Sequence, residues 1–279
     1  MDTLDATPTW WRPEAGRRAS PDGGVAFAAL VAFTGILFLS PQAWFPVLQN
    51  FRIALLAAGL AIVAHLLERT LHRQPVGPLH PEFVIALALV GWAALTAPLS
   101  YWPGGSVAEL IDPFLKAVAF FWLIGTLVTT QRRLRLFMWA LVLCSIPLSV
   151  SAVQHYRAGD FLITPAASVQ RITGFNDGGS GLAGNPNDLA LVLNLMIPLA
   201  AALCAAERAL AARAVAALAL LLAVAGVVVT FSRAGFVALA TIGLLSLVAM
   251  VRRAPAGALA VVLGLVVITP SVLPPGYTQ

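Results

Sequence analysis

Long apolar stretches alternate with short polar connections along most of the chain. A helix that crosses a bilayer needs about 20 mostly apolar residues, and nine stretches approach that length. They cover residues 24–40, 51–67, 82–99, 113–130, 135–153, 188–206, 214–231, 234–251 and 254–270. Helices are expected because hydrocarbon offers no partner for exposed backbone N–H and C=O groups, and the alternation of a lipid-facing barrel strand is absent. The pattern predicts an all-α, polytopic transmembrane bundle of about nine spans.

The basic residues predict the orientation of this bundle. Twelve of the 17 Lys and Arg residues fall in the N-terminal tail or in alternate connections: Arg12, Arg17, Arg18, Arg69, Arg73, Arg132, Arg133, Arg135, Arg208, Arg213, Arg252 and Arg253. Basic residues concentrate on the cytoplasmic side of membrane proteins. The tail, residues 1–23, is therefore predicted to be cytoplasmic, and nine crossings place the C-terminus on the outer side.

Composition narrows the class of protein further. Hydrophobic residues make up 59% of the chain, charged residues 10%, and mean hydropathy is +0.88, values that exclude an ordinary soluble domain. The net charge of +5 follows from the basic connections, so it predicts no nucleic-acid partner. The sequence holds no residue cluster with metal-ligand spacing and no phosphate-binding GxxxxGK[ST] loop. Within the sixth span, Asn194 and Pro198 predict a kink and an interhelical hydrogen bond.

Two outer connections are long enough to build a site, residues 100–112 and 154–188. The second has 35 residues, and loops of that length are usually functional or disordered. It ends in Asn-Pro-Asn-Asp, which fits a helix start: Asn185 as N-cap, Pro186 as the first residue, and Asp188 reaching back to the cap N–H. A helix start that faces outward can also bind an anion. Asn185 and Asn187 are therefore either substrate-binding residues or only a cap.

Three cations on the outer side are candidates for binding an anion. Arg171 has no acidic neighbour in sequence, and its guanidinium matches a phosphate bidentately. Arg233 interrupts the uncharged run 214–251; placing residues 232–235 in a turn moves it to the surface and avoids a cost of about 2.5–3.5 kcal/mol at the bilayer centre. Lys116 opens the fourth span. The alternative for Arg171 is a solvated loop arginine, and the alternative for Arg233 is an arginine that only marks the turn. The alternative for Lys116 is an interfacial lysine, which could pair with Asp112.

The segments RITGF, GNPNDLALVLNLMIPL and VVVTFSRAGFVAL, which begin at 171, 184 and 227, resemble the O-antigen ligase and polymerase family. SYWPGGS and DPFLK, within 100–116, resemble the family's earlier outer loop. The resemblance implies a multi-pass glycosyltransferase of the bacterial inner membrane. Such enzymes transfer a glycan from an undecaprenyl diphosphate carrier to lipid A core, another glycan or a protein, at the periplasmic face. The reaction uses no metal or nucleotide cofactor.

The same resemblance suggests roles for single residues. Arg171 matches the family's loop arginine, which is implicated in binding the carrier diphosphate. Asn185 and Asn187 match its asparagine motif, and Ser232 with Arg233 matches its SR motif. The resemblance makes residues 24–270 the ligase-like membrane domain and 271–279 the start of a truncated periplasmic loop. The family's catalytic histidine belongs to the part that would follow, so glycan transfer is expected only of a complete protein.

Two other classes of function remain open. A transporter or lipid flippase would need inward-facing charges near the bilayer midplane and broken helices in corresponding halves, whereas the charges here lie at predicted faces. An inactive fragment or scaffold is the other alternative. The leading hypothesis is a donor-binding membrane protein in which Arg171 and Arg233, with Lys116 in support, hold a diphosphate.

Overall fold

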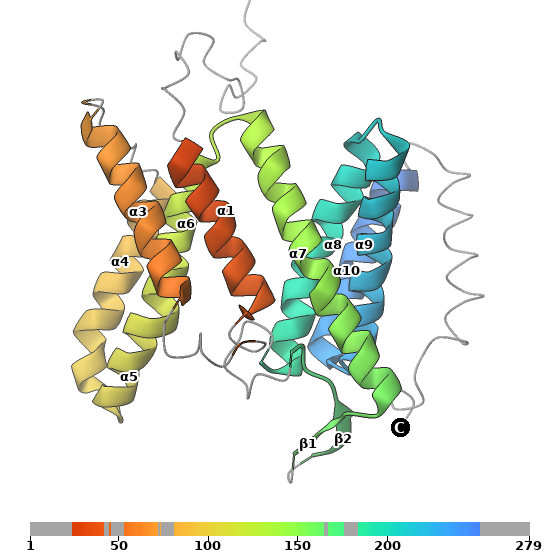
Figure 1. The fold of residues 1–279 in the computed structure, drawn as a ribbon. Coiled ribbons are helices and arrows are strands. Elements are labelled where there is room, and N and C mark those ends of the chain that lie inside the picture. The colour runs from red at the N-terminus through yellow and green to blue at the C-terminus, as the bar shows by residue number, and fades with distance from the viewer. Residues whose placement is uncertain are drawn as a thin grey trace, which may run out of the picture.

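The computed structural model describes residues 24–41, 45, 53–71, 73, 81–164, 167–175 and 184–251. These residues form a bundle of helices with one two-stranded hairpin (Figure 1). In chain order the elements are α1 Gly24–Leu39, α3 Ile53–Leu71, α4 Pro81–Thr96, η3 Ala97–Leu99, α5 Pro103–Glu109, η4 Leu110–Phe114, α6 Leu115–Leu127, α7 Gln131–Ala158, β1 Leu162–Thr164, β2 Ala167–Arg171, α8 Pro186–Ala206, α9 Leu210–Val229 and α10 Arg233–Val251. Eight of the nine predicted stretches coincide with helices, and the ninth, 254–270, lies outside the described residues.

Four of the described helical segments have the length and apolar composition of membrane spans: Pro81–Leu99, Gln131–Ala158, Pro186–Ala206 and Leu210–Val229. The helices Gly24–Leu39 and Leu115–Leu127 and the stretch Arg233–Ala249 are apolar but shorter. The chain therefore has the character of a helical membrane protein. The nine passes, the cytoplasmic N-terminus and the periplasmic C-terminus stay predictions.

The bundle has two ends with different contents (Figure 1). We call one the hairpin end: it holds the last turn of α7, the β1–β2 hairpin, residues 172–175 and the starts of α8 and α10. The end of α3 and the starts of α7 and α9 lie at the opposite end. Arg69, Arg132, Arg133, Arg135, Arg208 and Arg213 belong to those elements or their connection. The basic connections thus share one end, as the positive-inside pattern requires.

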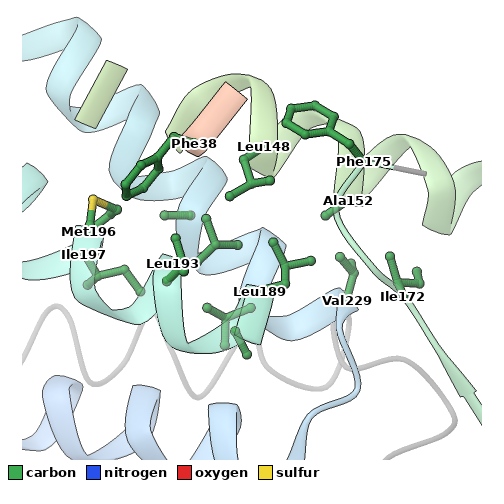
Figure 2. Close-up of a cluster of buried hydrophobic side chains, with 14 residues drawn as sticks. Phe38, Leu148, Ala152, Ile172, Phe175, Leu189, Leu193, Met196, Ile197 and Val229 are labelled. Atoms are coloured by element: carbon green, nitrogen blue, oxygen red, sulfur yellow. The ribbon is translucent and has the colours of Figure 1, made fainter. Parts of the chain in front are cut away.

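Three buried clusters hold the described helices together, and the smallest, around Val142 and Leu203, packs α7, α8 and α9. The largest joins the same three helices with Ile172 and Phe175, which follow the hairpin strand β2 (Figure 2). The second joins α1, α3 and α6, where the rings of Phe33 and Phe120 meet edge to face at 5.5 Å. Since α1 also packs against α7, the clusters form one continuous bundle.

The structure corrects both predicted outer loops. Residues 100–112 are mostly helical, because α5, η4 and α6 follow one another without a break from Pro103 to Leu127. The π-helical turn of η4 includes Pro113, which has no N–H to donate to the helix. The second loop starts later than residue 154, since α7 continues to Ala158 and ends at Gly159 with a left-handed φ of 76°. Within that loop, β1 and β2 pair antiparallel, with Leu162 opposite Arg171.

A buried carboxylate stabilises the end of the bundle opposite the hairpin. Glu207, which follows α8, accepts hydrogen bonds from Arg135 Nε at 2.8 Å and from Trp139 Nε1 at 2.9 Å, both on α7, and forms an ion pair with Arg135. Glu207 is 5% exposed. The hydrogen bond from Arg135, followed in size by the hydrogen bond from Trp139, lowers the pKa of Glu207 below its ordinary value of 4.5. The α8–α9 connection is therefore tied to the start of α7.

This contact predicts acid sensitivity. A carboxyl whose pKa is lowered by folding adds stability above its unfolded pKa and loses it as the pH falls through the folded pKa. We expect the protein in detergent to melt at a lower temperature below about pH 4.5. Glu207→Gln should lower the melting temperature at pH 7 and weaken this acid dependence. The exposed Glu82→Gln is the control; an equal effect of both variants at pH 7 would contradict the assignment.

Candidate functional site

The candidate site is the hairpin end, where segments far apart in sequence meet. Ile172, immediately after β2, is fully buried in the same cluster as Leu189 of α8 and Val229 of α9 (Figure 2). Ser151 Oγ of α7 donates to the carbonyl of Gly174 at 3.3 Å. The segment after the hairpin is thereby held against α7, α8 and α9.

The start of α8 has the predicted cap. The Asn185 side-chain oxygen accepts from the N–H groups of Asn187 and Asp188, both at 2.9 Å, and Pro186 is the first helical residue. The Asp188 carboxylate accepts from Asn185 Nδ2. The predicted partner of the Asp188 carboxylate was instead the backbone N–H of Asn185. Asn185 therefore has the structural role of a helix cap, which is the predicted alternative to substrate binding.

The start of α10 is capped by Ser232 and fastened to α8. Ser232 Oγ accepts from the N–H of Gly235 at 3.1 Å and donates to Asn187 Oδ1 at 2.8 Å. The turn before it contains Phe231 with a φ of 55°. The Ser232 hydroxyl thus joins the first turns of two helices that start side by side at the hairpin end.

Arg233 and Arg171 both belong to this end. Arg233 is the first residue of α10 and is exposed. The predicted turn at residues 232–235 lies too late in the chain, because α9 ends at Val229 and residues 233–235 already belong to α10. Arg171 is the last residue of β2 and is joined to buried Ile172; its side chain lies outside the described residues. The backbone positions of the two arginines are thus carried by segments of one cluster.

An aromatic group that the sequence did not predict joins these segments. The ring of Phe231 lies 6.0 Å from that of Tyr156 on α7 and 6.4 Å from that of Phe161, just before β1. His155 Nδ1 is 3.5 Å from the carbonyl oxygen of Thr173. These contacts connect the hairpin to the α9–α10 turn. The spacing of these residues in the sequence does not predict them.

Lys116 stands apart from this group. It lies in the first turn of α6, in the part of the bundle formed by α3, α4, α5 and α6. The structure brings Asn185, Asn187, Ser232 and Arg233 together through the starts of α8 and α10. In the described part of the chain, α6, which carries Lys116 in its first turn, packs mainly against α1, α3 and α4. A supporting role for Lys116 at this site remains a prediction.

The electrostatics of the site favour an anion. Helix starts carry a partial positive charge, and here two starts lie next to each other with the exposed Arg233 guanidinium. Asp188 opposes this field, but its carboxylate is engaged with the Asn185 amide. In the described part of the chain no three His, Cys, Asp or Glu residues are grouped to hold a metal ion.

Comparisons of the chain with protein-family models, with curated proteins and with solved structures find no match.

Proposed function

We propose that this protein binds an undecaprenyl-diphosphate-linked glycan at the periplasmic face of the bacterial inner membrane, as the donor-binding part of an O-antigen ligase-like glycosyltransferase. The single observation that carries the proposal is the junction of α8 and α10. Asn187 and Ser232 join two helix starts beside an exposed arginine, and β2 ends at Arg171 in the same region.

The proposed chemistry is electrostatic. A diphosphate carries charge that guanidinium groups can neutralise with paired hydrogen bonds, and helix starts add partial positive charge. The apolar spans would leave the isoprenoid tail in the bilayer while the head group lies at the hairpin end. Stabilisation of a leaving diphosphate then requires positioning and fixed charge. In this proposal Asn185 and Asn187 act by shaping the helix start.

A binding experiment tests the proposal on the chain as it exists. The protein in lipid nanodiscs should retain undecaprenyl diphosphate in preference to uncharged undecaprenol. Arg233→Gln and Arg171→Gln should each weaken retention by about tenfold to a hundredfold, because a hydrogen bond to a charged group contributes about 1.5–3 kcal/mol.

Arg213→Gln is the matched control, since Arg213 is exposed in the first turn of α9 at the opposite end. It removes the same charge from the protein and should leave retention unchanged. If all three variants lose retention equally, the effect is one of net charge and the site is wrong. In cells, deletion of the gene should accumulate carrier-linked glycan, and normal levels of mature surface polymer would contradict the proposed pathway.

A further inference from the structure

A groove lies on the flank of the bundle, between α4 and the continuous helix formed by α5, η4 and α6. Its volume is about 1140 Å³, and it is open rather than enclosed. One wall includes Leu89, Ala93 and Ser100, and the other includes Ser106 and Phe114. Alanines on both walls leave room between the helices, and the π-helical turn of η4 forms part of the second wall. Such turns often occur where a helix serves a functional site.

The length of the groove matches one leaflet of a membrane. Its lining residues on the first wall run from Leu89 to Ser100, which corresponds to about 16 Å along a helix. The hydrocarbon core of a bilayer is about 30 Å thick. Pro81–Leu99 has the composition of a membrane span, and the lining residues of this wall belong to its second half and the residue that follows it. The helix α4 ends at the same end of the bundle as the hairpin (Figure 1).

The chemistry of the lining changes along this length. Toward the middle of the span it is apolar, and its lining there includes Leu89 and Ala93 of α4 and Ala117 of α6. At the hairpin side it contains the hydroxyls of Ser100 and Ser106, which are 2.8 Å apart, and Glu109, whose carboxylate is the one charged group among the described lining residues. The groove therefore offers an apolar channel that ends in hydrogen-bond acceptors and a negative charge.

We propose that this groove binds one phospholipid whose head group carries a primary ammonium, such as phosphatidylethanolamine. One acyl chain lies between α4 and α6, and the ammonium binds Glu109 and the serine hydroxyls at the rim. The Glu109 carboxylate disfavours a purely anionic head group, which distinguishes this site from the arginine-bearing hairpin end. The inference rests on the groove alone and does not depend on the proposed donor.

Trp102 provides a structural control at the rim, because its ring packs on Gly105 and lines the groove. A Cβ at residue 105 would lie 2.4 Å from Trp102 Cε3, whereas a Cβ at residue 104 would lie 3.8 Å from Trp102 Nε1. Gly105→Ala must therefore displace the indole, and Gly104→Ala need not. The pair alters the shape of the groove without altering its charge.

The experiment uses the protein in nanodiscs made from equal parts of phosphatidylethanolamine, phosphatidylglycerol and phosphatidylcholine. Native mass spectrometry then counts the lipid that the released protein retains. We expect preferential retention of phosphatidylethanolamine, because the quaternary ammonium of phosphatidylcholine cannot donate a hydrogen bond. Glu109→Gln should reduce the preference by about fivefold, the upper range for an exposed ion pair. Gly105→Ala should reduce retention more than Gly104→Ala.

Two bulky variants separate a bound lipid from ordinary surrounding lipid. Ala93→Trp fills the groove and should abolish selective retention, whereas Ala94→Trp, on an exposed position outside the lining, should preserve it. Equal retention of all three lipids by the native protein would overturn the proposal. An unchanged preference in Glu109→Gln would also overturn it; this exposed residue can be replaced without disturbing a buried contact.

Discussion

Gly235→Ala is expected to push the starts of α8 and α10 apart and to destabilise the protein by about 1–3 kcal/mol, the usual cost of overpacking. A Cβ at residue 235 would lie 2.4 Å from the Cβ of Ala190 on α8. Ala190 is fully buried, and a Cβ atom cannot rotate away, so the backbones must separate. Small residues let membrane helices approach in this way. Thermal unfolding in detergent measures the loss.

The control is Gly243→Ala on the same helix, where an added Cβ meets no atom within 4 Å. Both substitutions gain the same helix propensity, so the difference between them reports the crossing of α8 and α10. Adding Ala190→Gly to Gly235→Ala should restore much of the stability by removing the facing methyl group. Equal melting temperatures for the two alanine variants would show that the crossing tolerates the extra atom.

Local chemistry explains why much of the fold could be predicted. Long apolar runs interrupted by charged turns mark the helices, and eight of them appear close to their predicted places. The start of α8 could be placed because Asn185 and Pro186 act within one turn of chain. Arg233 could be placed because a charge inside a span is costly. These signals depend on residues close in sequence.

The errors arise where tertiary contacts outweigh local signals. Residues 100–112 contain proline, two adjacent glycines and several polar side chains, so they resemble a loop, yet Pro103 serves as a helix start and Trp102 covers Gly105. Composition does not indicate that α5 continues into α6. For the same reason the predicted loop 154–188 starts too early. Gln154 and Arg157 are polar, as loop residues often are, but they belong to α7.

The candidate site was predictable only in part. The sequence supplied the residues at the starts of α8 and α10, but the bond from Ser232 to Asn187 crosses 45 positions. No pattern among neighbouring residues predicts a contact between two positions so far apart in the sequence. The structural roles of these residues also change their interpretation, because a side chain used to join two helices positions the site rather than contacts the substrate. The role of Arg171 remains a hypothesis that the binding experiment addresses.

Asn194→Asp is the second large effect that we expect. Asn194, a buried residue of α8, donates from Nδ2 to the carbonyl oxygens of Ala190 at 2.9 Å and of Gly235 at 3.0 Å. This confirms the predicted interhelical hydrogen bond and adds its partner on α10. Aspartate has nearly the same shape, but it places a carboxylate oxygen where Asn194 has its Nδ2 donor. That oxygen would then face the carbonyl oxygens of Ala190 and Gly235. Ionised, it costs about 2.5–3.5 kcal/mol near the centre of a span; protonated, its single O–H serves one carbonyl.

Asn194→Leu separates the buried charge from the lost hydrogen bond. Leucine removes the interhelical bond, which contributes about 0.6–1.7 kcal/mol in membrane proteins, and also removes Asn194 Oδ1, a buried oxygen with no hydrogen-bond partner among the described residues. We therefore expect a modest loss of stability for leucine and a severe one for aspartate, measured as the folded fraction in detergent at pH 7. If the leucine variant were the less stable of the two, the carbonyl groups of Ala190 and Gly235 would not be the partners that hold Asn194 between α8 and α10.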